Sequence, residues 1–246
     1  MTFNTSNPVF TNYFWFKTSG KTKMTLSGIF WKALFSIILI GLTASFVWYR
    51  FFNGASIRWL TYGGMFTATI LSLIISFYHK TAKYLLPFYA LAKGLFLGGI
   101  SAYAHKRYPY LPIQAVALTI ITFFVMLWLY YFKIIKVTRK FRTVVTTAVA
   151  TIFLVYLVSF ILAFFNIHIM RFLWGNSWLA IAFNAAAILA ASFSLALDFY
   201  YIDKQLYKSP KAREWLATWG LLITLVWLYV ELLRILKKLA GRNLRL

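Results

Sequence analysis

The sequence predicts an all-α polytopic membrane protein with seven transmembrane helices. First, 62% of its 246 residues are hydrophobic and only 12% are charged, which is far more apolar than a soluble domain of this length requires. Second, the chain contains seven apolar runs of about 20 residues, the length that crosses a bilayer as a helix. Third, these runs do not alternate polar and apolar residues, so they do not resemble strands of a membrane barrel.

Seven helices are expected in order along the chain. In lipid a helix satisfies its own backbone hydrogen bonds, so each apolar run is read as one helix. The expected helices cover residues 28–49, 59–78, 84–103, 113–132, 143–165, 178–202 and 215–236. The connections are too short for a separate soluble domain. We expect a cytoplasmic N-terminal tail (1–27), one seven-helix transmembrane domain (28–239) and a short basic C-terminal tail (240–246).

The distribution of Lys and Arg predicts a cytoplasmic N-terminus, because short basic connections stay in the cytoplasm. The tail and the second, fourth and sixth connections are rich in Lys and Arg, whereas the opposite connections are not. The opposite connections hold Arg50, Arg58, Lys106, Arg107 and Arg171. The basic C-terminal end conflicts with seven crossings, and a re-entrant last segment is the alternative. Seven crossings are favoured because residues 221–233 are apolar apart from Thr224 and Glu231.

The formal net charge of +22 does not point to nucleic acid, because the basic residues separate apolar runs instead of lining a water-facing groove. They are expected to meet anionic lipid headgroups. The chain has no cysteine and none of the common metalloprotease, hydrolase or nucleotide-binding motifs. We therefore expect neither an enzyme nor a cofactor.

Three ionisable residues fall within the apolar runs, namely Lys93, Asp198 and Glu231. A charge inside a membrane is costly, so such residues are candidates for function. For Lys93 the alternatives are an ammonium at the interface, a pair with a carboxylate, or a place in a transport path. Glu231 can pair with Arg234 three residues later, and Asp198 can be solvated at a helix end. Asp203 and Glu214, on either side of the sixth connection, are expected to be solvated.

Contact between Asp198 and Glu231 depends on where the last helix begins. A helix beginning at residue 215 puts Glu231 about 24 Å from its start, which is far beyond Asp198. If residues 209–219 instead lie along the membrane interface and the crossing begins near Gly220, the two carboxylates come within reach.

Small residues recur four positions apart in two of the runs and predict close helix packing. Gly94 and Gly98 mark the third expected helix. The sixth carries Ala185, Ala186, Ala187, Ala190, Ala191 and Ser194. The sixth helix is therefore expected inside the bundle.

Five stretches resemble the bacterial Bax inhibitor-1/YccA-like family. They are "MTLSGIF" (24–30), "PFYALAKGLFLGGIS" (87–101), "KVTRKFR" (136–142), "LALDFYYID" (195–203) and "EWLATWGLLITLVWLYVELLRIL" (214–236). The resemblance implies seven helices with the last enclosed by the other six, in a bacterial inner membrane. It also implies a pH-sensitive calcium leak in which Asp198 and Glu231 form a proton-sensitive latch. A second implied role is binding to a membrane-bound ATP-dependent protease.

Two positions differ from the family pattern. Lys93 stands where relatives commonly carry Glu, and Tyr200 stands where many carry a second Asp. Calcium prefers six to eight oxygen ligands, so a path with fewer carboxylates and an added ammonium suits calcium less well.

Overall fold

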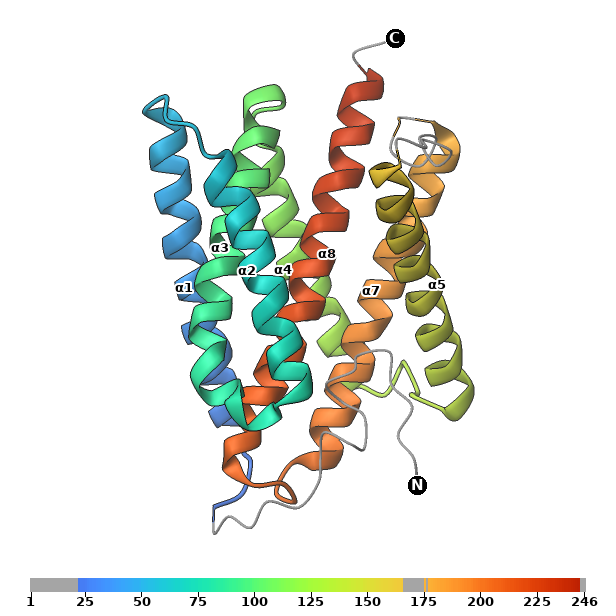
Figure 1. Cartoon of the computed structure of the whole chain (residues 1–246). Helices are drawn as coiled ribbons and strands as arrows, with labels where there is room; N and C mark the ends of the chain where they lie inside the picture. The colour runs from blue at the N-terminus through green and yellow to red at the C-terminus, as the bar shows by residue number, and fades with distance from the viewer. Residues whose placement is uncertain (1–21, 166–174, 176, 244–246) are drawn as a thin grey trace. The chain divides into compact units, whose positions relative to one another are not determined.

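The computed structural model describes residues 22–165, 175 and 177–243, with the backbone alone at 163–164 and 243. Most of the expected N-terminal tail, Arg171 and the last three residues lie outside this part. The long helices are α1 (Leu26–Phe52), α2 (Arg58–Phe77), α3 (Ala82–Arg107), α4 (Leu111–Tyr131), α5 (Arg139–Phe164), α7 (Trp178–Gln205) and α8 (Glu214–Asn243) (Figure 1). Two short 3₁₀ turns, η3 (His79–Thr81) and η4 (Lys211–Arg213), precede α3 and α8.

The seven predicted helices are confirmed, with ends that differ by a few residues. Within the described ranges, seven helical segments are long and apolar enough to cross a membrane. Length and composition therefore agree with the all-α membrane architecture expected from the apolar runs.

The chain divides into two units. One contains α1, α2 and α3 together with the end of α7 from Tyr201 and the start of α8 up to Leu222. The other contains α4 from Ile113 onward, α5 and the remaining parts of α7 and α8.

Helix α8 is one continuous helix of 30 residues, about 45 Å long. The alternative in which residues 209–219 lie separately along the interface is wrong, because residues 214–219 form the first turns of α8. Ala217 and Trp219 in these turns are fully buried, unlike side chains resting at a lipid surface. In the apolar part of α8, 78% of the residues are buried, which is the highest share among the seven segments.

Glycines set the packing of α3 in the first unit. A Cβ added to Gly94 would meet Thr43 and the Ile40 backbone of α1, and one added to Gly98 would meet Ala44. Gly64 of α2 is equally close to the backbone of α3. The close packing predicted from the small residues is thus confirmed for α3.

Alanines have a similar role on α7 in the second unit. Ala187 and Ala190 are buried against Ile152 of α5, and Trp227 of α8 packs on the same cluster. The close packing predicted from the small residues is confirmed for α7 as well.

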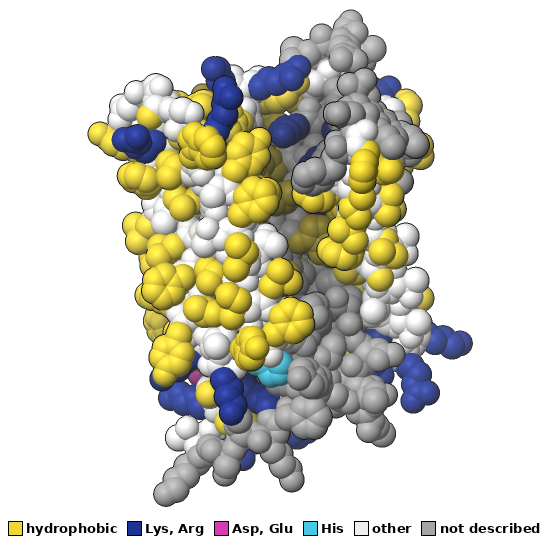
Figure 2. Space-filling model, viewed as in Figure 1, with side chains coloured by type: hydrophobic (Ala, Val, Ile, Leu, Met, Phe, Trp, Pro, Cys, Tyr) yellow, Lys and Arg dark blue, Asp and Glu magenta, His cyan; other side chains and the backbone are white. Residues whose placement is uncertain are grey.

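Large apolar side chains cover the outer faces of the helices. On α1 they include Phe30, Trp31, Phe35 and Phe46, all at least 46% exposed. Figure 2 shows hydrophobic side chains over much of the visible helix surface, with Lys and Arg nearer the helix ends. Such surfaces are unfavourable in water and suit contact with acyl chains.

A small substitution tests the packing of α1 on α3. Gly94→Ala should lower the free energy of unfolding by about 1–3 kcal/mol, because the added methyl group meets the Ile40 backbone, which cannot rotate away. Thermal unfolding of the purified protein in detergent would measure the change.

The matched control is Gly41→Ala on α1, where an added Cβ meets nothing within 4 Å. This variant should unfold at the parent temperature or slightly above it, because Ala favours a helix more than Gly does. Equal losses in both variants would contradict the packing argument.

Candidate functional site

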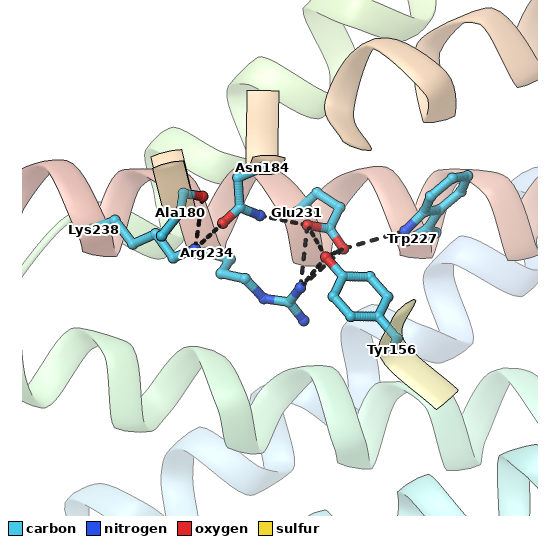
Figure 3. A network of polar contacts seen from close by, with 7 residues as sticks. All are labelled: Tyr156, Ala180, Asn184, Trp227, Glu231, Arg234 and Lys238. Carbon is cyan, nitrogen blue, oxygen red and sulfur yellow. Dashed lines mark hydrogen bonds and ion pairs between the residues drawn. The ribbon is translucent and has the colours of Figure 1, made fainter. Parts of the chain in front are cut away.

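Glu231 is a carboxylate of α8 that is only 1% exposed. Its oxygens accept hydrogen bonds from the Tyr156 hydroxyl of α5 at 3.0 Å and from the Asn184 amide of α7 at 2.6 Å. Trp227 and Arg234, both on α8, donate at 3.2 Å. Donors from three helices therefore converge on one buried negative charge (Figure 3).

The polar network continues from Glu231 toward the C-terminal end of α8. Asn184 donates to Glu231 through its amide nitrogen and accepts through its amide oxygen from the Lys238 ammonium. Lys238 is only 4% exposed, and it also donates to the Ala180 carbonyl at 3.0 Å. Asn184 thus bridges an acid and a base that both lie on α8 (Figure 3).

Arg234 contacts the same network in two ways. Its Nη1 lies 3.2 and 3.3 Å from the two oxygens of Glu231, and it also donates to the Tyr156 hydroxyl. The guanidinium carbon lies 4.8 Å from the centre of the Tyr156 ring, within range of a cation–π contact. The local Glu231–Arg234 pair that the sequence offered as an alternative is confirmed.

Asp198 is fully buried in α7, so the alternative of a solvated carboxylate at the helix end is wrong. Thr224 of α8, itself 3% exposed, donates its hydroxyl to the Asp198 carboxylate at 2.6 Å. The small residues of α7 explain the burial, because they bring its surface close to its neighbours. Asp198 therefore links α7 to α8, as Asn184 does further along.

Asp198 and Glu231 lie at different heights along the axis of α8. Thr224, the partner of Asp198, precedes Glu231 by seven positions, about 10 Å along the helix axis. A direct contact required the last crossing to begin near Gly220, whereas α8 begins at Glu214. In this arrangement each carboxylate is held by its own donors, and the latch between the two acids stays a prediction.

A family model described as Bax inhibitor 1 like matches residues 7–241, which is nearly the whole chain. The chain belongs to the Bax inhibitor 1 like family. Membership and the seven spanning helices together make it a multi-pass integral membrane protein. No curated protein matches the sequence significantly.

In this family member Glu214 is fully buried, so the prediction that it is solvated is wrong. Its carboxylate accepts from the Thr25 amide at 2.9 Å, from the Thr25 hydroxyl at 3.0 Å and from the Lys32 ammonium at 2.5 Å. Thr25 is the N-cap of α1, and its hydroxyl accepts from the Gly28 amide. Glu214 therefore reinforces the start of α1, where a negative charge is favourable.

Gly28 makes this arrangement sterically feasible, because a Cβ at this position would overlap the Glu214 carboxyl group. The segment before α1 also pairs with the connection between α7 and α8. Met24 donates to the Ser209 carbonyl at 2.8 Å, and Tyr207 donates to the Met24 carbonyl at 3.1 Å. Asp203, near the end of α7, is exposed, as predicted.

Lys93 of α3 has aromatic neighbours. Its ammonium lies 5.5 Å from the centre of the Tyr89 ring and 5.8 Å from the centre of the Phe96 ring. A ring face attracts a cation through its quadrupole, which offsets part of the cost of burial. Aromatic rings therefore contact this ammonium, and not the carboxylate that was one of the predicted alternatives.

Sequence reasoning did not identify four members of the Glu231 network, namely Tyr156, Asn184, Trp227 and Lys238. Asn184 carried a usable signal, because an amide inside the apolar run "AIAFNAAAI" needs a hydrogen-bond partner in lipid. Lys238 was counted with the basic end beyond the last expected helix, whereas α8 continues to Asn243. Tyr156 lies among apolar residues of α5, and tyrosines are too frequent in this chain to stand out.

Replacing the acid that contacts α1 tests the Glu214 cluster. Glu214→Gln should lower the free energy of unfolding by about 3 kcal/mol, because Lys32 loses the charge that balances it in a largely buried setting. Thermal unfolding in detergent would measure the loss. Asp203→Asn, at the exposed acid of α7, should leave the unfolding temperature unchanged. A Glu214→Gln protein as stable as the parent would contradict the assignment.

Proposed function

We propose that this protein is a pH-sensitive ion leak in its membrane, controlled by the buried carboxylates of Asp198 and Glu231. The observation that carries the proposal is the convergence of donors from α5, α7 and α8 on the nearly inaccessible Glu231. Because those donors belong to three helices, the charge of a single side chain influences how the helices are held together.

Protonation of Glu231 weakens this junction. Hydrogen bonds to an ionised acceptor are roughly twice as strong as those between neutral groups. A proton on Glu231 removes the charge that Arg234 balances, and it also turns one acceptor oxygen into a donor. The contacts of Tyr156 and Asn184 with α8 then weaken, so acidification favours looser helices and faster ion passage.

Asp198 has the corresponding role at its own level of α8. Its bond from Thr224 is a contact between α7 and α8 in a fully buried place. Loss of its charge weakens that contact for the same reason. The two carboxylates therefore act on the contact between α7 and α8 at two heights along α8.

The orientation and the membrane are part of the proposal. We place the chain in the plasma membrane of a bacterium. We place its N-terminus in the cytoplasm, on the same side as most of the basic connections. Anionic headgroups are the proposed partners of these basic connections.

A second candidate function is that of a non-transporting regulator that binds a membrane-bound ATP-dependent protease. Two observations favour it. The Lys93 ammonium lies near two aromatic rings of α3, and the negative charge of Glu231 is already balanced by Arg234. Both reduce the attraction of the helices for cations. Absence of any flux, together with capture of a protease by crosslinking, would support this function over the leak.

Flux measurements on proteoliposomes test the leak. Reconstituted parent protein should pass ions faster as the pH falls, and Glu231→Gln should show the fast rate at every pH, because the amide carries no charge to lose. Asp198→Asn should flatten the pH profile in the same direction. Fluorescent indicators inside the vesicles, for protons, sodium and calcium in turn, would record the rates.

Asp203→Asn serves as the control, since this acid is exposed and lies outside both clusters. It should retain the parent profile. If the Asp198 and Glu231 variants also retain the parent profile, the two carboxylates do not control the leak.

A further inference from the structure

We infer that Arg234 keeps divalent cations away from Glu231, so that the path through this site admits protons and rejects calcium. The inference rests on the proposed ion leak and specifies which ions that leak carries. It follows from the occupancy of the carboxylate oxygens, from the charges around them and from the position of one tyrosine hydroxyl.

The oxygens of Glu231 have little capacity left for a metal ion. A carboxylate offers about four lone-pair sites. Four different side chains donate to it, namely Tyr156, Asn184, Trp227 and Arg234. Calcium seeks six to eight oxygen ligands at about 2.3–2.6 Å, so it binds here only if several of these donors leave.

The two other side-chain oxygens of this network are also engaged. The Asn184 amide oxygen accepts from the Lys238 ammonium, and the Tyr156 hydroxyl accepts from Arg234. In this network a metal ion therefore competes with cationic donors at each oxygen. A hydrated divalent ion has no ready-made set of ligands to exchange for its water shell.

The charges of the network also oppose a divalent cation. Glu231 contributes one negative charge, whereas Arg234 and Lys238 contribute two positive charges. Repulsion between like charges is strong at these separations inside an apolar environment. Arg234 has the larger effect on the acid, because it touches both oxygens directly while Lys238 reaches it through Asn184.

A proton can enter the same network without displacing Arg234. It adds to one oxygen of Glu231 and forms an O–H bond there, and the pair of Glu231 and Arg234 changes from neutral to singly positive. Tyr156 can adapt, because a hydroxyl both donates and accepts hydrogen bonds. It donates to Glu231 in the charged state and can accept from it in the neutral state, so only a rotation of the hydroxyl is needed.

The test compares proton and calcium flux in proteoliposomes of the parent and two variants. Arg234→Gln removes the positive charge and should raise the ratio of calcium to proton flux by about tenfold or more, since a unit charge at hydrogen-bond distance is lost. Arg234→Lys keeps the charge and serves as the matched control. It should retain the low parent ratio.

The double variant Glu231→Gln with Arg234→Gln shows whether the gain depends on the acid. It should lose the raised calcium flux of Arg234→Gln, because no carboxylate is left to attract the metal. Equal calcium ratios in the parent and in a folded Arg234→Gln protein would overturn the inference. Size-exclusion chromatography and thermal unfolding would establish which variants are folded.

A measurement on the unmodified protein does not depend on any variant. Millimolar calcium should leave the proton leak of the parent unchanged, because calcium does not reach Glu231 while Arg234 is in place. Inhibition of that leak by calcium would overturn the inference and leave the proposed leak intact. Absence of any flux from the parent would instead overturn the proposed leak.

Discussion

A negative charge buried in an apolar medium requires hydrogen-bond donors around it. Three of the four acids of the chain are buried and have such donors. Asp198, Glu214 and Glu231 are at most 1% exposed. Each accepts from side chains of other helices or from a neighbouring helix terminus. All three either belong to α8 or bond to it, and α8 also has the largest buried share among the seven apolar segments.

These clusters differ in what they can do. Glu214 is paired with Lys32 and contacts the start of α1, an arrangement that fixes a helix end. Glu231 has donors on α5, α7 and α8, so its charge affects several helix contacts at once. Asp198 has a neutral hydroxyl donor in Thr224 on α8. One acid therefore stabilises a helix end, and the other two carry the response to protons that we propose.

Much of the fold could be predicted from the sequence, because the length of each apolar run sets the length of a spanning helix. The Glu231–Arg234 pair could also be anticipated, since residues three apart on a helix are neighbours. The roles of Tyr156 and Asn184 could not, because they depend on how α5 and α7 pack beside α8. Glu214 was misjudged because its burial depends on the missing side chain of Gly28, on a helix nearly the whole chain away.

The contact between Glu214 and Thr25 joins residues 189 positions apart. During synthesis the first helix leaves the ribosome long before the last, so its N-terminal capping is incomplete while the intervening helices are being inserted. The start of α1 receives its acidic partner only after Glu214, the first residue of α8, has been made. A product truncated before Glu214 therefore leaves Lys32 without that carboxylate.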